Sequence, residues 1–126
     1  MHILFIEPDR LLARTYRQAL ELAGHTVHVA ATAQAAVQAA DEQRPDVVIL
    51  ELQLVGHSGI EFLYEFRSYD DWQAVPVVVL SLVPPGEFAG SRQLLAEQLG
   101  VHNYLYKPHT SLAKLQRTIN QYTPVA

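Results

Sequence analysis

Short apolar runs alternate along the chain with longer segments in which apolar residues recur every three or four positions. The short runs predict strands, and the longer segments predict amphipathic helices. The expected strands cover 2–6, 26–30, 46–51, 76–81 and 102–106, and the expected helices cover 9–23, 32–43, 58–68, 88–99 and 111–122. Regular alternation of strand and helix is typical of a parallel α/β sheet with helices on both faces.

The predicted strands are of two kinds. The runs 2–6, 46–51 and 76–81 are almost wholly apolar, which is expected of strands that helices cover on both faces. The run 26–30 reads Thr-Val-His-Val-Ala and alternates instead, which favours a position at the edge of the sheet.

Residues suited to helix ends stand at the predicted boundaries. Asp9 can cap the first helix and Gly24 can end it. Thr32 or Ala33 opens the second helix, and Ser58 caps the third. The boundaries therefore agree with the periodicity.

Composition narrows the class of protein. The 126 residues suffice for one domain, which we expect to cover 1–122, with 123–126 as a tail or the start of a linker. A net charge of −4 gives no electrostatic case for nucleic acid, and the absence of cysteine excludes disulfides and thiolate chemistry. No apolar run is long enough for a membrane helix. These features predict a cytoplasmic domain that contacts neither membrane nor nucleic acid.

One segment links this pattern to a known family. The stretch 45–59, PDVVILELQLVGHSG, resembles the phosphorylation segment of receiver domains in bacterial response regulators, where an aspartate in the place of Glu51 accepts a phosphoryl group. Three further segments resemble the family in order: 3–9 as the first strand with its acidic end, 77–81 as the fourth strand with a switch hydroxyl at Ser81, and 100–108 as the fifth strand with a switch aromatic at Tyr104 and the pair Lys107-Pro108. The resemblance covers nearly the whole chain.

The resemblance implies a flavodoxin-like receiver fold. Its five parallel strands would have the order 2-1-3-4-5, so that the carboxyl ends of the first and third strands flank the topological switch point. The family also implies a cis peptide bond between Lys107 and Pro108.

The metal site of the family is incomplete here. Receivers hold Mg²⁺ with an acidic pair after the first strand, the acceptor aspartate and a backbone carbonyl two residues beyond it. Here the pair reads Glu7-Pro8, and proline offers no side-chain oxygen. We expect the carboxylate of Asp9 to cap the first helix rather than face the pocket. Glu7, Glu51 and Gln53 remain as a remnant that binds Mg²⁺ weakly at most, and no cofactor is expected.

Two other positions around the pocket also indicate that the site is not phosphorylated. Leu82 stands where the family usually has a small residue, and its bulk should obstruct a phosphodonor. Lys107 is retained and should pair with Glu51 or Glu7. Such a pair would lock the site in one state, and the sequence leaves open whether that state is on-like or off-like.

We therefore expect a degenerate receiver, or pseudo-receiver: a phosphorylation-independent interaction module of two-component signalling rather than an enzyme. Its partner would be a histidine kinase, a phosphotransfer protein or an output domain, and homodimerisation is left open. One alternative is a functional phosphoacceptor in a phosphorelay. Another is a small-molecule-binding domain on the same fold, with a pocket lined by Leu82, Pro84 and Tyr104.

Overall fold

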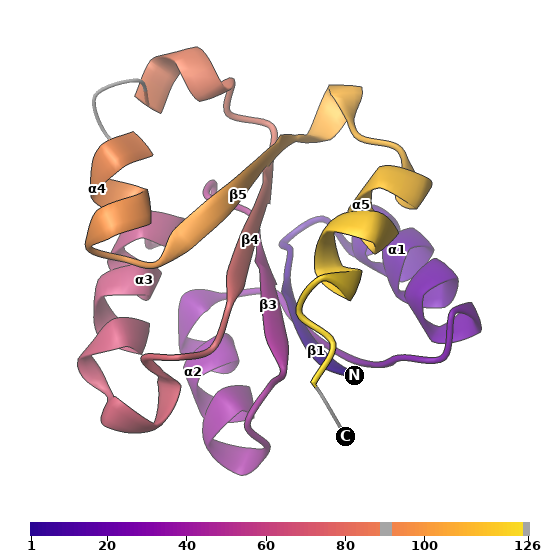
Figure 1. The fold of residues 1–126 in the computed structure, drawn as a ribbon, viewed down its shortest axis with the longest axis horizontal. Coiled ribbons are helices and arrows are strands. Elements are labelled where there is room, and N and C mark those ends of the chain that lie inside the picture. Colours follow the sequence, from indigo (N-terminus) through magenta and orange to yellow (C-terminus); the bar gives the residue numbers. More distant parts are fainter. Residues whose placement is uncertain (89–91, 125–126) are drawn as a thin grey trace.

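The computed structural model describes residues 1–88 and 92–124. Its strands are β1 (His2–Ile6), β2 (Thr26–Ala30), β3 (Val47–Leu50), β4 (Val77–Ser81) and β5 (Val101–Tyr106). Its α-helices are α1 (Arg10–Leu22), α2 (Ala33–Glu42), α3 (Gly59–Ser68), α4 (Arg92–Glu97) and α5 (Leu112–Asn120), and short 3-10 helices form at η1 (Asp70–Trp72), η2 (Pro85–Phe88) and η3 (Lys107–His109). The strands make one five-stranded parallel sheet of order β2-β1-β3-β4-β5, which confirms the predicted fold class (Figure 1).

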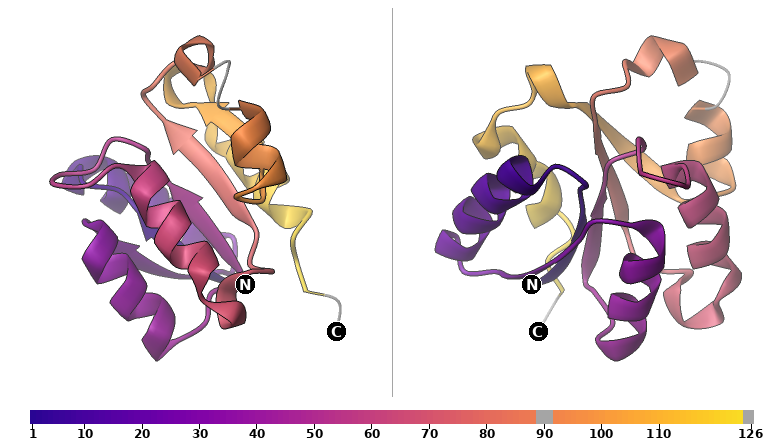
Figure 2. Two further views of the ribbon diagram at one scale, coloured as in Figure 1. Left: turned by 90° about the vertical axis from the view of Figure 1, so that its left-hand side faces the viewer. Right: turned by 180° about the vertical axis from the view of Figure 1, so that it is seen from behind.

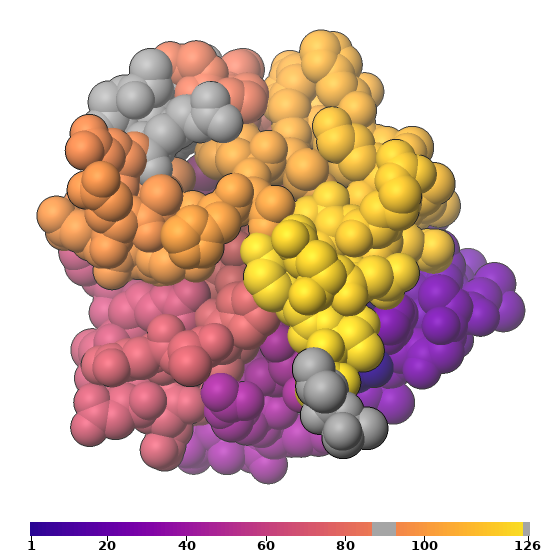
Figure 3. Space-filling model, in the orientation of Figure 1, coloured from indigo at the N-terminus to yellow at the C-terminus, as the bar shows by residue number. Residues whose placement is uncertain are grey.

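The sheet lies between two layers of helices. Helices α1 and α5 cover one face, and α2, α3 and α4 cover the other (Figures 1 and 2). In the space-filling view, α5 and the chain from α4 to β5 form much of the face turned to the viewer (Figure 3). None of the described helices is long and apolar enough to cross a bilayer.

Alternation along the central strands divides the core in two. In β1, Ile3 and Phe5 pack with α1 and α5, whereas Leu4 and Ile6 pack with the opposite layer. All four side chains are buried, because successive residues of a strand point to opposite faces. The nearly continuous apolar runs in the sequence are the consequence of this double coverage.

The predicted helix ends are confirmed at the described boundaries. The Asp9 carboxylate accepts hydrogen bonds from the first turn of α1, Thr32 caps α2 and Ser58 caps α3. Gly24 follows α1 with φ +98°, a left-handed conformation that glycine adopts without penalty. Ser111 also caps α5, a boundary for which no cap was predicted.

Three local expectations differ from the structure. The bond between Lys107 and Pro108 is trans, since the described residues contain no cis peptide, and the chain passes directly from β5 into η3. The predicted strand 46–51 is shorter, because β3 ends at Leu50 and the polar residues on either side lie outside it. Within the predicted helix 88–99, α4 covers only Arg92–Glu97, and 89–91 lie outside the described residues.

The half-buried Arg67 side chain ties the end of α3 to two loops. Its Nε donates to the carbonyl of Leu99 at 2.8 Å, and Nη1 donates to the carbonyls of Trp72 and Gln73 at 2.7 and 3.2 Å. Burial lowers the pKa of the guanidinium, but these carbonyls satisfy its donors. The Arg67 side chain therefore links the end of α3 to the chain around Trp72 and to the residue Leu99 before β5.

We expect Arg67→Met to reduce the free energy of unfolding by about 1–3 kcal/mol, because it leaves partly buried carbonyls without a donor while keeping an apolar stem. Urea denaturation measures the loss. Arg14→Met is the matched control, since Arg14 is exposed on α1 and should change stability little. Equal stability of the two variants would show that the Arg67 hydrogen bonds are dispensable.

Candidate functional site

The candidate site lies at the carboxyl edge of the sheet. Glu7 directly follows β1, Glu51 follows β3 and Lys107 follows β5, while Ser81 is the last residue of β4. Strands β1 and β3 are adjacent and in register, and the backbone N–H of Glu51 donates to the carbonyl of Ile6 at 3.0 Å. The parallel topology thus brings together four side chains that are far apart in sequence.

The Glu51 carboxylate is fully engaged. Its Oε1 accepts from the Lys107 ammonium at 2.9 Å and from the backbone N–H of Leu82 at 3.0 Å. Its Oε2 accepts from the backbone N–H of Gln53 at 3.1 Å and from the Ser81 hydroxyl. A carboxylate has about four acceptor positions, so these four donors fill them.

Lys107 joins both carboxylates. Besides Glu51, its ammonium contacts Oε1 of Glu7 in a second buried ion pair. The side chains of Lys107, Glu7 and Glu51 are 6%, 2% and 3% exposed. Two carboxylates and one ammonium leave a formal charge of −1 in a site that excludes solvent.

Burial and pairing act in opposite directions on these groups. Burial alone would raise the pKa of Glu51, but hydrogen bonds from Lys107, Ser81 and the two backbone N–H groups outweigh it and lower that pKa below 4.5. Burial alone would lower the pKa of Lys107, but the hydrogen bonds to Glu51 and Glu7 raise it above 10.5. Both residues are therefore charged at neutral pH.

The two acidic residues that follow β1 have different roles. Glu7 faces the site, and its Oε2 accepts from the backbone N–H of Asp9 at 3.1 Å. The Asp9 side chain turns away and caps α1, accepting from Leu11 N at 3.0 Å and Leu12 N at 3.1 Å. Pro8 between them supplies neither a side-chain oxygen nor an N–H.

Lys107 contacts both carboxylates of the site in which a metal remnant was expected. The Lys107 ammonium lies between the two carboxylates that a metal would need, and the oxygens of Glu51 are already saturated. Among the described residues, no cluster of three or more His, Cys, Asp or Glu side chains could hold a metal ion. Within the predicted remnant, both carboxylates are engaged by Lys107, and Gln53 contacts Glu51 through its backbone N–H.

A chain of hydrogen bonds leads from Glu51 to β5. The Ser81 hydroxyl donates to Glu51 and accepts from the backbone N–H of Val83 at 3.0 Å. The Tyr104 hydroxyl in turn donates to the carbonyl of Val83 at 2.6 Å. Leu82 between them directs its N–H inward while its side chain is 50% exposed. The start of the loop after β4 is thereby fixed to the site.

Some features of the site have no clear signal in the sequence. The backbone N–H groups of Gln53 and Leu82 are donors that any residue except proline would provide. Gly59 is a different case, because a Cβ there would lie 2.7 Å from the Cα of Leu52. This close approach is visible only in the fold.

Two histidines near this edge stay outside the network. His57 pairs with Glu61 at 3.0 Å on the surface of α3. The ring of His109 packs edge-on against Tyr106. Neither has a hydrogen bond to Glu51 or Lys107 among the contacts of the described residues.

Comparison with known proteins adds a second line of observation. The family model of the response regulator receiver domain matches residues 3–120. The KDP operon transcriptional regulatory protein KdpE of Escherichia coli (strain K12) is 36% identical over 107 residues, covering 85% of this chain and 44% of that protein. The transcriptional regulatory protein KdpE of Mycobacterium tuberculosis (strain CDC 1551 / Oshkosh) is 34% identical over 127 residues, covering 98% of this chain and 53% of that protein. The chain thus spans about half the length of these relatives.

Solved structures show the same architecture. The chemotaxis protein CheY4 of Vibrio cholerae superposes with a TM-score of 0.82 at 21% identity, over 96% of this chain and 97% of that one. The receiver domain of the sensor histidine kinase PA1611 from Pseudomonas aeruginosa PAO1, which has a magnesium ion coordinated in its active site cleft, gives 0.77 at 27% identity, over 96% of this chain and 95% of that one. Both similarities extend over the whole sheet and its helices.

We expect Lys107→Met to lower the free energy of unfolding by about 3–5 kcal/mol, because it leaves two buried carboxylates without their counter-ion. Chemical denaturation at neutral pH measures this loss. Lys114→Met, which removes an exposed ammonium on α5, is the matched control and should be nearly neutral. A similar small effect of both changes would contradict a stabilising role for the buried pair.

The pH dependence of stability follows from the same shifts. Because folding lowers the pKa of Glu51, its stabilisation is present above pH 4.5 and is lost as the pH falls through the lower folded value. Because folding raises the pKa of Lys107, its contribution is present below pH 10.5 and is lost above the raised value. The stability difference between the natural protein and Glu51→Gln should therefore be constant near neutrality and shrink in acid. Urea titrations at several pH values test this, and a difference that grows in acid would refute it.

Proposed function

The chain belongs to the family of response regulator receiver domains, and on that premise we propose that it is a signalling module whose output does not depend on phosphorylation. The observation that carries this proposal is the Glu51 carboxylate with all four acceptor positions filled. A nucleophile must present a free lone pair to phosphorus. Glu51 can present one only by giving up a buried hydrogen bond.

The chemistry of phosphoryl transfer supports the same proposal. Transfer to a carboxylate needs a divalent cation and a correctly placed nucleophile, because catalysis is mostly positioning and charge stabilisation. Here Pro8 removes one metal ligand, and Lys107 occupies the space between Glu7 and Glu51. Glutamate is also one methylene longer than the aspartate of the family, and a misplacement of about 1 Å can cost on the order of 10²-fold in rate.

In this proposal Lys107 and Glu51 form a permanent internal pair. The ammonium and the Ser81 hydroxyl bind the carboxylate as they would bind an anionic phosphoryl group. The Ser81–Val83–Tyr104 hydrogen bonds then hold the loop after β4 in one position without a modification. The domain would present a constant surface to its partner.

The partner and the parent protein belong to the proposal as well. We infer a domain over 1–122 with a short tail at 123–126, working with a histidine kinase, a phosphotransfer protein or an output domain. The two KdpE relatives are named as transcriptional regulators and are about twice as long as this chain, which supports an output domain in the same polypeptide. Self-association through a homodimer fits the same role.

A functional phosphoacceptor is the second candidate. It is favoured by Ser81 and Lys107, which keep the hydroxyl and the ammonium of the family in contact with residue 51. The small-molecule alternative has less support, because Tyr104 lines a hollow with residues of α4 and β5 rather than with Leu82 and Pro84.

Intact-protein mass spectrometry after incubation with acetyl phosphate and Mg²⁺ separates the two candidates. We expect no phosphoryl adduct on the natural protein, because Glu51 has no free acceptor position and no metal partner. The triple variant Pro8→Asp, Glu51→Asp, Leu82→Ala should gain a phosphoryl adduct. It restores a metal ligand and the shorter nucleophile, and it opens the pocket to the phosphodonor.

Two results would contradict this expectation. An adduct on the natural protein that Glu51→Gln abolishes would establish the phosphoacceptor instead. Efficient phosphorylation of the single variant Glu51→Asp would show that Pro8 and Leu82 do not limit the reaction. Circular dichroism of each variant confirms that the fold is retained.

A further inference from the structure

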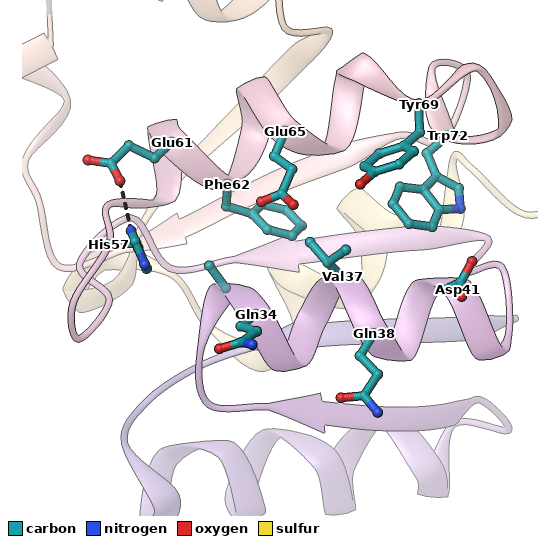
Figure 4. A pocket seen from close by; sticks show the side chains of 11 residues that line it. Gln34, Val37, Gln38, Asp41, His57, Glu61, Phe62, Glu65, Tyr69 and Trp72 are labelled. Atoms are coloured by element: carbon teal, nitrogen blue, oxygen red, sulfur yellow. Dashed lines mark hydrogen bonds and ion pairs between the residues drawn. The ribbon is translucent and has the colours of Figure 1, made fainter.

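A groove of about 770 Å³ runs between α2 and α3, on the sheet face opposite α1 and α5 (Figure 4). Val37 of α2 and Phe62 of α3 lie across it from one another and form an apolar floor. The volume is within the range of ligand sites, about 300–1,000 Å³. The groove contains none of the four side chains of the Glu51 network, so it is a separate site.

A row of four aromatic side chains, contributed by α3 and the segment that follows it, lies beside this groove. Phe62 stacks on Phe66 with ring centroids 5.2 Å apart, and Phe66 stacks on Trp72 at 5.0 Å. Tyr69 then packs on Trp72 at 4.7 Å with a tilt of 53°. The first three rings are buried, but Tyr69 is 45% exposed. The row therefore ends in an aromatic ring that is open to the groove and held by its neighbours.

Two carboxylates line the groove near the Tyr69 ring, one from each helix. Glu65 reaches toward the groove from α3, one helical turn before Tyr69, and Asp41 lies across from them on α2 (Figure 4). Neither Glu65 nor Asp41 has an ion pair or a side-chain hydrogen bond among the described residues. At the other end, the Glu61 carboxylate pairs with His57 at 3.0 Å.

Among the described residues that line the groove there is no lysine or arginine. Arg44 follows α2, but it donates to the backbone carbonyl of Asp71 and does not line the groove. An exposed aromatic ring that shares a groove with unpaired carboxylates of α2 and α3 is complementary to a cation, because the ring face and the carboxylates both carry negative potential.

We propose that the α2–α3 groove binds an arginine-bearing segment of a partner protein, with a guanidinium stacked on Tyr69 between Glu65 and Asp41. The planar guanidinium suits this place better than an ammonium, since it stacks on a ring and forks toward carboxylates at its edge. The apolar floor of Val37 and Phe62 receives the aliphatic part of the segment.

A second copy of the chain is a less suitable occupant. Its Arg10 and Arg14 form an exposed stripe on α1 and would match the groove in charge. A contact between α1 of one copy and the α2–α3 groove of the next is heterologous, however, and propagates into open chains unless the rotation closes a ring. We therefore assign the groove to a different protein. This assignment does not depend on whether Glu51 accepts a phosphoryl group.

Trp72 provides the measurement, because it is the only tryptophan of the chain and lines the groove. The probe is an acetylated and amidated peptide, Arg-Ala-Ala-Ala-Arg, titrated into the protein at low salt. We expect a saturable change in Trp72 fluorescence that weakens as salt is added. The same peptide with citrulline in place of arginine keeps the shape without the charge and should not bind.

Matched variants locate the site. Tyr69→Ala and Glu65→Gln should each weaken binding by about threefold or more, in line with the strength of exposed cation–π and ion-pair contacts. Tyr64→Ala is the control for the first, since Tyr64 is an exposed tyrosine of α3 outside the groove lining. Glu42→Gln on α2 is the control for the second and should leave the affinity unchanged.

Three outcomes would overturn the proposal: equal binding of the citrulline peptide, no binding at millimolar arginine peptide, or the same loss in the controls as in the groove variants. Analytical ultracentrifugation of the natural protein tests the alternative occupant of the groove, a second copy of the chain. Concentration-dependent assembly that Arg14→Glu abolishes would reassign the groove to a second copy of the chain. A phosphorylated Glu51 would overturn the proposed function but leave this result untouched.

Discussion

The buried ammonium of Lys107 is the interaction on which the rest of this structure depends. It follows β5 and contacts carboxylates that follow β1 and β3, so one side chain links the ends of three strands. Removing such charges from water is costly, and the cost is offset only while every partner is in place. The backbone N–H groups of Gln53 and Leu82 and the Ser81 hydroxyl supply the remaining partners of Glu51. The network is therefore cooperative, and the start of the loop after β4 is fixed as part of it.

In the proposed function, the contacts that stabilise the site also restrict its chemistry. A carboxylate whose acceptor positions are filled by buried donors is a good structural anion and a poor nucleophile or metal ligand. Pro8 adds to this restriction, because no second acidic side chain stands beside Glu7. If recognition is the task of the domain, it must use surfaces instead. The α2–α3 groove is such a surface, with Tyr69 and Glu65 open to solvent on a helix whose opposite side is anchored in the core.

Much of the fold could be predicted because the sheet is covered on both faces. Double coverage produces continuous apolar runs, and these gave the positions of β1, β3 and β4, while the alternation of Thr26–Ala30 gave the edge strand. The order of the strands came from the family resemblance, since periodicity does not determine which strands are neighbours. The expectations failed at the ends of β3 and at the end of α4, where the local pattern does not fix the boundary, and at the trans bond before Pro108, which the family resemblance had implied to be cis.

The sequence by itself determined which chemical groups are available at the carboxyl edge: the carboxylates of Glu7 and Glu51, the ammonium of Lys107, and a proline at position 8 that offers no side-chain oxygen. It also indicated correctly that Asp9 caps α1, because capping is a local interaction. Only the tertiary structure decided that Lys107 contacts both carboxylates, and that backbone N–H groups complete the shell of Glu51. It alone brought Asp41 opposite Tyr69 and Glu65. The physical reason is the same in each case: these contacts join residues from different strands or helices, and their distances are set by the packing of the sheet and its layers rather than by any local pattern in the chain.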